Sequence, residues 1–131
     1  MNASKSRRKF SDNAITTVSP ARIIVLCYER LDRDLEGAAT AMERQARSDA
    51  HELCCHAQDI IAELLGALDQ DAWEHASSLA GIYTWSLAHL MRANIQQNPE
   101  MIREVQTVLA ELRVGFTQAA LEAPANVNGV A

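Results

Sequence analysis

The stretch from Ile15 to Met42 constrains the fold of this chain more than any other part of the sequence. Ser19 and Pro20 form a strong helix start, because a serine side chain can accept hydrogen bonds from the first backbone N–H groups and proline at the first helical position loses no bond. Apolar or small residues then recur alternately four and three positions apart, at Ile24, Tyr28, Leu31, Leu35, Ala38 and Met42. This spacing predicts an amphipathic helix, from Ser19 to about Ala46, that packs against other helices.

Two further segments repeat this periodicity after breaks in the chain. Asp49 and Glu52 have the spacing of a capping box and predict the start of a second helix. Its wide apolar stripe consists of Leu53, Ala57, Ile60, Leu64 and Ala67, with Ile61, Leu65 and Leu68 beside it. Asp71 and Glu74 repeat the capping-box spacing, and a third helix is expected to run to about Gln97. Its apolar positions are Ala76, Leu79, Tyr83, Leu87 and Leu90.

Asn98 and Pro99 give a further helix start, with the acidic Glu100 placed near the positive end of the helix dipole. Apolar residues follow at spacings of three and four, at Ile102, Val105, Leu109, Leu112 and Phe116. Four long helices with short connections predict an all-α fold, an antiparallel four-helix bundle with an N-terminal extended arm or short cap helix. We expect residues 1–14 to form a flexible basic arm, residues 15–122 the bundle domain, and residues 123–131 a disordered tail.

Length and composition limit the function classes. A chain of 131 residues can bury a core without metals or disulfides. No apolar run approaches the roughly 20 residues that cross a bilayer, and no secretory signal is visible, so we expect a cytoplasmic protein without membrane insertion. The 3 cysteines do not form a disulfide framework. Four of the 12 basic residues precede Asp12, which leaves an acidic body and argues against nucleic acid as a partner.

Candidate catalytic and metal sites are weak. His51, Cys55 and Asp59 share a helix face, but no second pair of ligands is visible, so no metal or other cofactor is expected. His56 and His89 are mid-helix histidines, as in phosphotransfer bundles, yet no lysine accompanies either one. Without a phosphate-binding loop, a nucleophile elbow or a paired carboxylate site, the sequence predicts a protein that is not an enzyme.

Two features allow both a packing and a binding interpretation. Glycines inside predicted helices, at Gly37, Gly66, Gly81 and Gly115, fit close helix packing or surface troughs for a partner helix. Tyr28 and Tyr83 lie on the seams of the first and third helices. Core packing is the simpler interpretation of these tyrosines, and an anchor in a binding groove is the alternative.

Motifs along the chain resemble the flagellar export chaperone family FliS. The lead-in contains Phe10, Asn13, Ile15, Thr17, Ser19 and Pro20, continued by Ile23, Ile24, Leu26 and Tyr28. The second helix carries AQDII, at 57–61, then Glu63, Leu64, Leu68 and Asp69. The third carries Leu79, Tyr83, Leu90 and RANI at 92–95, and the fourth Glu104, Val105, Leu112, Arg113 and Phe116. The sequence departs from the family pattern after the first tyrosine, at Phe116, where a tryptophan is usual, and before the third helix.

The resemblance implies a cytosolic chaperone that binds the C-terminal polymerisation segment of flagellin, prevents premature assembly and assists delivery to the flagellar type III export apparatus. It points to flagellin contacts at Ile15, Ile24, Tyr28, Ile61, Tyr83 and Asn94. Phe10 and Ile15 would form an N-terminal lid over the same grooves. The flagellar export gate is a second candidate partner, and we expect a monomer or weak homodimer. The alternative function is a self-associating helical adaptor without flagellin binding.

Overall fold

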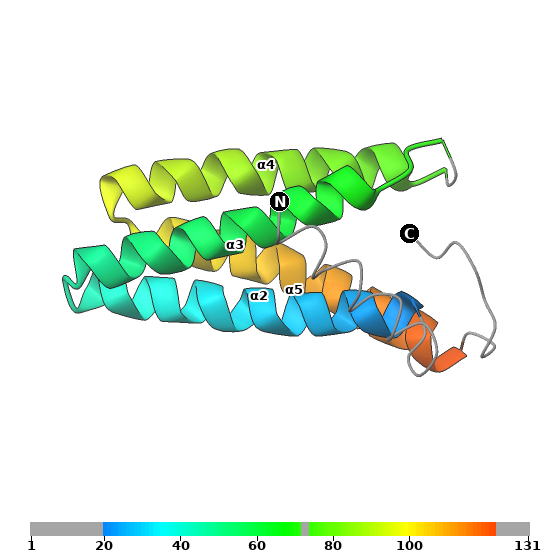
Figure 1. The fold of residues 1–131 in the computed structure, drawn as a ribbon, viewed down its shortest axis with the longest axis horizontal. Coiled ribbons are helices and arrows are strands. Elements are labelled where there is room, and N and C mark those ends of the chain that lie inside the picture. The colour runs from blue at the N-terminus through cyan, green and yellow to red at the C-terminus, as the bar shows by residue number, and fades with distance from the viewer. Residues whose placement is uncertain (1–19, 72–73, 123–131) are drawn as a thin grey trace, which may run out of the picture.

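The computed structural model describes residues 20–71 and 74–122, which form four helices and no strand. These are α2 (Pro20–Glu43), α3 (Arg47–Ala67), α4 (Ala76–Gln96) and α5 (Pro99–Glu122). Successive helices run in opposite directions (Figure 1). Each packs against two neighbours, since α2 contacts α3 and α5 while α4 contacts the same two helices from the opposite corner. The predicted all-α antiparallel bundle is confirmed; the arm or cap helix lies outside the described residues.

The helix seams predicted from the sequence supply most of the core. In α3 the predicted stripe is wrong, because the buried residues are Ala50, Cys54, Ala57 and Ile61, whereas Leu53, Ile60 and Leu64 are only partly buried and Ala67 is exposed. Tyr28, Leu31 and Leu35 of α2 are at most 2% exposed, and Ile61, Leu90 and Ile102 contribute from the other three helices with no exposed surface. Small residues such as Ala38 and Ala57 are also fully buried, which lets the helices approach closely. Burial of each large apolar side chain contributes about 1.5–3 kcal/mol to folding before conformational entropy is subtracted.

The proline starts are confirmed, whereas both predicted capping boxes are wrong. α3 begins at Arg47, two residues before Asp49, and its N-cap Ala46 makes no side-chain cap hydrogen bond. α4 begins at Ala76, also without a side-chain cap. Asp71 instead donates its backbone N–H to the Asp69 carboxylate at 3.0 Å, which is an Asx turn in the connection before α4. Aspartate followed three residues later by glutamate is common on solvated helices and does not by itself define an N-terminus.

Two tight turns at the same end of the bundle determine where the helices stop. Gln45 and Gln97 have φ angles of 60° and 51°, in the left-handed region. Beyond them, Ala46 N–H donates to Ala41 O at 2.8 Å and Asn98 N–H to Ala93 O at 3.0 Å. This is the Schellman pattern, which satisfies the last carbonyl groups of α2 and α4. The start of α3 is therefore set by the turn that ends α2.

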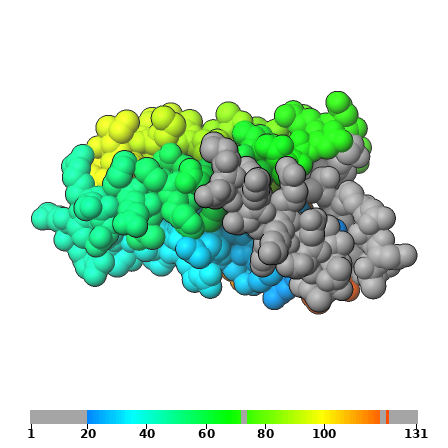
Figure 2. Space-filling model, in the orientation of Figure 1, coloured from blue at the N-terminus to red at the C-terminus, as the bar shows by residue number. Residues whose placement is uncertain are grey.

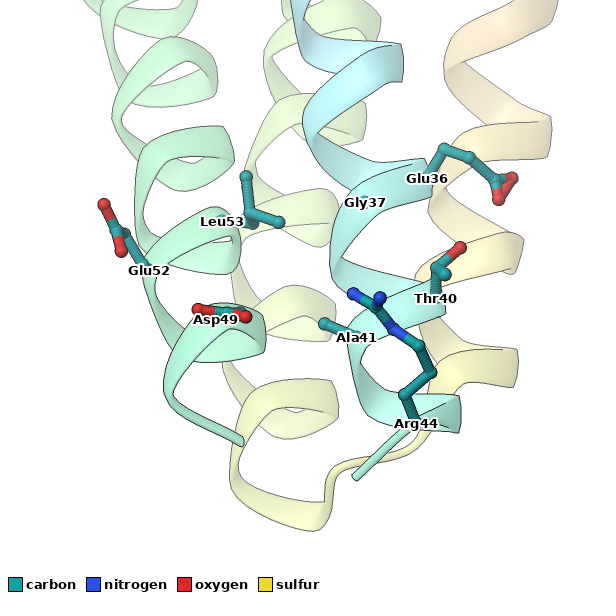
Figure 3. Close-up of a pocket in the computed structure, with 8 residues that line it drawn as sticks. All are labelled: Glu36, Gly37, Thr40, Ala41, Arg44, Asp49, Glu52 and Leu53. Carbon is teal, nitrogen blue, oxygen red and sulfur yellow. The ribbon is translucent and has the colours of Figure 1, made fainter. Parts of the chain in front are cut away.

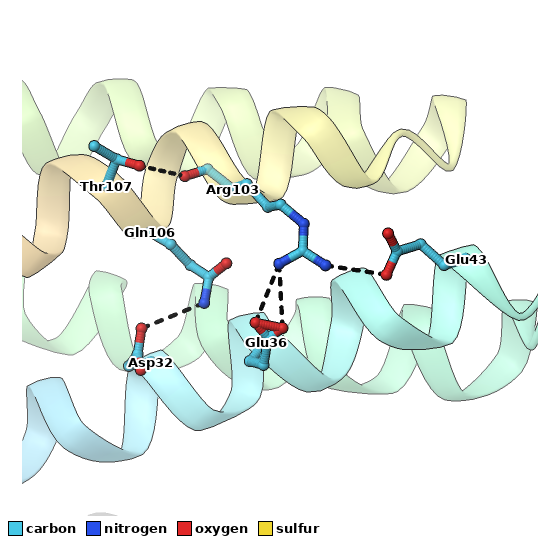
Figure 4. A network of polar contacts seen from close by, with 6 residues as sticks. All are labelled: Asp32, Glu36, Glu43, Arg103, Gln106 and Thr107. Carbon is cyan, nitrogen blue, oxygen red and sulfur yellow. Dashed lines mark hydrogen bonds and ion pairs between the residues drawn. The ribbon is translucent and has the colours of Figure 1, made fainter.

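Ion pairs cover the seam between α2 and α5 (Figure 4). The Arg103 guanidinium donates to both carboxylate oxygens of Glu36, at 3.1 and 3.2 Å, and to Glu43 at 3.0 Å. The hydrogen bond to Glu36 is the main reason why the pKa of Arg103 is raised. Arg113 and Glu29 form a further pair at 3.4 Å. Exposed pairs of this kind add little stability, but they mark the α2–α5 flank as a polar surface.

A buried carboxylate lies between α2 and α3. Asp34 is 5% exposed and pairs with His56 of α3 and with Arg30, whose Nε lies 3.4 Å away. A carboxylate at this depth requires such partners, because an unpaired buried charge is strongly destabilising.

None of the four described helices combines the length and the apolar character that a membrane-spanning helix requires.

The Asn98 cap gives a direct stability prediction. Asn98 Oδ1 accepts the Glu100 N–H at 3.0 Å, so Asn98→Ala should lower the free energy of unfolding by about 1 kcal/mol. Asp49→Ala is the matched control. Asp49 caps nothing in the structure and should cost only the few tenths of a kcal/mol of its interaction with the helix dipole. Urea denaturation followed by circular dichroism measures both, and equal losses would contradict the assignment.

Candidate partner-binding surface

The residues to which the family resemblance points occupy three different environments. Tyr28 and Tyr83 are each 2% exposed and Ile61 is fully buried, so all three lie in the core. Ile24 is partly buried and packs against that core. Asn94 lies near the end of α4 with its side chain partly accessible. Ile15 and Phe10 are outside the described residues. The described members of this set therefore do not form one continuous surface patch.

Tyr28 and Tyr83 meet in the centre of the bundle. Their hydroxyl oxygens are 2.6 Å apart, so one donates a hydrogen bond to the other. Burial raises the pKa of both hydroxyls, and for Tyr28 the neighbouring Tyr83 adds to the effect. Phe116 of α5 stacks on Tyr28 with ring centroids 5.6 Å apart. Because α2 and α4 are diagonal helices, this pair joins two elements that otherwise make little contact. Their burial is what the core-packing interpretation predicts.

Asn94 belongs to a polar cluster where the end of α4 lies beside the start of α3. Its Nδ2 donates to Nδ1 of His51 at 2.8 Å. Gln97 Nε2 donates to the backbone carbonyl of Asn94 at 2.8 Å and to its Oδ1 at 3.3 Å. A hollow of about 600 Å³ adjoins the cluster and is lined by Arg47, Ser48, His51, Asn94, Ile95 and Gln97.

A second hollow, of about 420 Å³, lies between α2 and α3 (Figure 3). Gly37 lies at its floor, and a Cβ there would come 3.0 Å from a methyl carbon of Leu53. Close helix packing therefore explains Gly37, while a Cβ on Gly66, Gly81 or Gly115 would meet nothing within 4 Å. The rim is charged, with Glu36, Arg44, Asp49 and Glu52, so this hollow is a poor site for an apolar partner.

The outward face of α4 is the feature that sequence reasoning missed. Arg92 is the one Asp, Glu, Lys or Arg among the 21 residues of this helix. Trp85, Met91 and Ile95 are 37%, 55% and 73% exposed. Figure 2 shows α4 along the upper edge of the molecule. The sequence contains no Asp, Glu, Lys or Arg from Ala76 to Met91. The spacing of apolar residues identifies the buried side of a helix, however, and gives no information about its outer face. Exposed apolar residues on a helix face with a single charged side chain, Arg92, are typical of a protein-binding surface.

The histidines considered for phosphotransfer lie against carboxylates. His56 Nδ1 pairs with Asp34, and His89 Nε2 is 3.1 Å from Glu104. The His89 ring also stacks on Trp85, with centroids 4.7 Å apart. A phosphoryl group on either imidazole would be repelled by the adjacent carboxylate. Within residues 20–71 and 74–122, no three histidine, cysteine or acidic side chains converge as metal ligands.

The described residues thus define a helical-bundle protein with an apolar outer helix face and a polar cluster at one end. The family model described as flagellar protein FliS matches residues 2–123, and the chain belongs to this family. The predicted resemblance is therefore confirmed.

Two relatives are named for a role in flagellar secretion. The flagellar secretion chaperone FliS of Bacillus subtilis (strain 168) is 26% identical over 110 residues, which cover 84% of this chain and 82% of that protein. The flagellar secretion chaperone FliSB of Pseudomonas aeruginosa is 30% identical over 118 residues, covering 88% of this chain and 94% of that protein. The family and these names support a chaperone of flagellar export.

The tyrosine pair can be tested by a double-mutant cycle. Tyr83→Phe leaves the buried Tyr28 hydroxyl without its partner and should lower the free energy of unfolding by about 1–3 kcal/mol. Tyr28→Phe should cost a similar amount. The double variant should cost clearly less than the sum, because it removes both hydroxyls together. Urea denaturation of the four proteins measures the coupling, and additive losses would rule out the hydrogen bond as a stabilising contact.

Proposed function

We propose that this chain is a cytoplasmic, non-enzymatic chaperone that binds the C-terminal polymerisation segment of flagellin. Holding that segment prevents premature assembly, and the complex is delivered to the flagellar type III export apparatus, where the export gate is a further candidate partner. Family membership and the names of the two relatives support this role. The observation that carries the proposal is the outer face of α4, where three apolar side chains are exposed and Arg92 is the one residue of the Asp, Glu, Lys and Arg types.

The contacts that we propose follow from accessibility. An amphipathic helix of the flagellin segment would lie along α4, its apolar side chains against Trp85, Met91 and Ile95. Gly81 continues this face without a side chain and leaves room for close approach. Asn94 supplies polar groups beside this face, on the side toward α3, where its side chain is partly accessible.

The buried members of the predicted set have a supporting role in this proposal. Tyr28, Ile61 and Tyr83 hold the helices in place beneath the binding surface, since a partner would reach them only if the helices separated. Ile24 is partly accessible at the margin of the core, and we propose it as a second contact, on α2. A segment that folds on binding loses conformational entropy, so the full interface should exceed the surface of α4 alone, beyond about 2,000 Å².

Calorimetric titration with a flagellin C-terminal peptide tests the proposal. We expect a complex at micromolar or lower concentration, and Ile95→Ser should weaken it by about tenfold through loss of an apolar contact. Val114→Ser is the matched control, because Val114 of α5 is 61% exposed and lies on a different helix. The absence of any complex at micromolar concentration would refute the function. Equal effects of the two substitutions would refute the α4 surface while leaving the function intact.

The arm that contains Phe10 and Ile15 lies outside the described residues, and its role as a lid is part of the proposal. If the arm competes with flagellin for the same groove, deletion of residues 1–15 should tighten peptide binding, because no displacement cost remains. The titration described above, repeated on the shortened chain, measures this change. Unchanged or weaker binding would show that the arm is not a lid.

A further inference from the structure

The accessible side of α4 carries a seven-residue repeat that is separate from its buried seam. Its members, alternately three and four positions apart, are Gly81, Thr84, Ala88, Met91 and Ile95. Ala88 is partly exposed and the other members are exposed. Residues with this spacing form the line along which two helices pack as a coiled coil. This outer seam extends about 21 Å along the helix axis, which is enough for one partner helix of about four turns.

The side chains of the outer seam differ in size from one end to the other. A Cβ on Gly81 would meet nothing within 4 Å, so the surface is open at this end. Ala88 adds only a methyl group, whereas Met91 and Ile95 are large and exposed. Interlocking packing requires large residues opposite small ones. A helix that fits this surface therefore has bulky apolar side chains facing Gly81 and Ala88.

Arg92 lies beside the outer seam with most of its donors available. Its Nη2 donates to Nδ1 of His89 at 3.3 Å, and His89 Nε2 donates to Glu104 at 3.1 Å. The histidine thus engages the Glu104 carboxylate, and within the described part of the chain no carboxylate pairs with Arg92. A guanidinium has five N–H donors and binds carboxylates with two parallel hydrogen bonds. The His89 ring also stacks on Trp85, which lies seven positions before Arg92 on the same side of the helix.

We propose that the outer seam binds one amphipathic helix of the export substrate, and that this helix places an acidic side chain against Arg92. The inference rests on the proposed function and adds the chemistry of the bound segment. The acidic residue would lie about 10 Å along the axis from the residue that faces Trp85. A second copy of the chain fits less well, because α4 contains no Asp or Glu and two α4 helices docked together would leave Arg92 unpaired.

A double-mutant cycle between chain and peptide tests the charge contact. The parent and Arg92→Gln chains are titrated calorimetrically with a flagellin C-terminal peptide, and with the same peptide in which every Asp and Glu is replaced by Asn and Gln. Arg92→Gln should weaken binding of the acidic peptide by about three- to fivefold and leave binding of the amide peptide nearly unchanged. Arg33→Gln is the matched control. It removes the same charge from an exposed position on α2 and should leave both affinities close to those of the parent.

Two glycine variants test the close approach of the partner. Gly81→Gln and Gly66→Gln each place a long side chain at an open helical position, and glutamine favours the helix more than glycine. Both chains should therefore keep the fold, as measured by circular dichroism. Only Gly81→Gln should weaken peptide binding, by about tenfold, because its side chain occupies the space that the partner helix needs.

The outcomes separate this inference from the function on which it rests. If the parent binds the peptide but Arg92→Gln and Arg33→Gln have equal effects, or the two glycine variants do, the inference is overturned and the chaperone function stands. If no chain forms a complex with the peptide, both are refuted.

Discussion

The hydrogen bond between the Tyr28 and Tyr83 hydroxyls is the interaction on which the arrangement of the bundle depends. Ridges and grooves explain how neighbouring helices pack, but they leave the diagonal pair α2 and α4 without a direct constraint. Two buried hydroxyls satisfy each other only at one distance and one relative position of these helices. The pair therefore selects one arrangement among the many that an apolar seam would allow. Its contribution to specificity follows from the penalty for leaving either oxygen unpaired.

Because the buried tyrosine hydroxyls bind each other, they are not available to a partner. A surface for a partner protein must therefore lie on the outside of the bundle. The flank between α2 and α5 is occupied by the Arg103 and Arg113 ion pairs, and the hollow beside Gly37 has a charged rim. The outer face of α4 has neither feature. Near the C-terminal end of this helix, Asn94 forms the polar cluster with His51 of α3. One helix thus provides the proposed surface for a protein partner and one side of the polar cluster.

The helices and their starts at proline were predictable because they follow from local chemistry, as at Pro20 and Asn98. The start of α3 was not, because the left-handed turn at Gln45 decides it, and glutamine carries no sequence signal for that conformation. Spacing also placed Tyr28 and Tyr83 on the seams correctly. It could not distinguish a seam that faces the core from one that lines a groove, since both have the same period. The hydrogen bond between Asn94 and His51 joins residues 43 positions apart, a separation at which periodicity carries no information.

The two short turns divide the molecule into helical hairpins, α2 with α3 and α4 with α5, both closed at the same end (Figure 1). Contacts within each hairpin link residues close in sequence, so their loop-closure entropy is small. Contacts between hairpins, such as Tyr28 with Tyr83 at a separation of 55 positions, form at greater entropic cost. The most extensive helix contact, between α2 and α5, is of this second kind, so closing the bundle carries the largest loop-closure cost. A newly synthesised chain would therefore complete its core only once α5 is available to pack on α2.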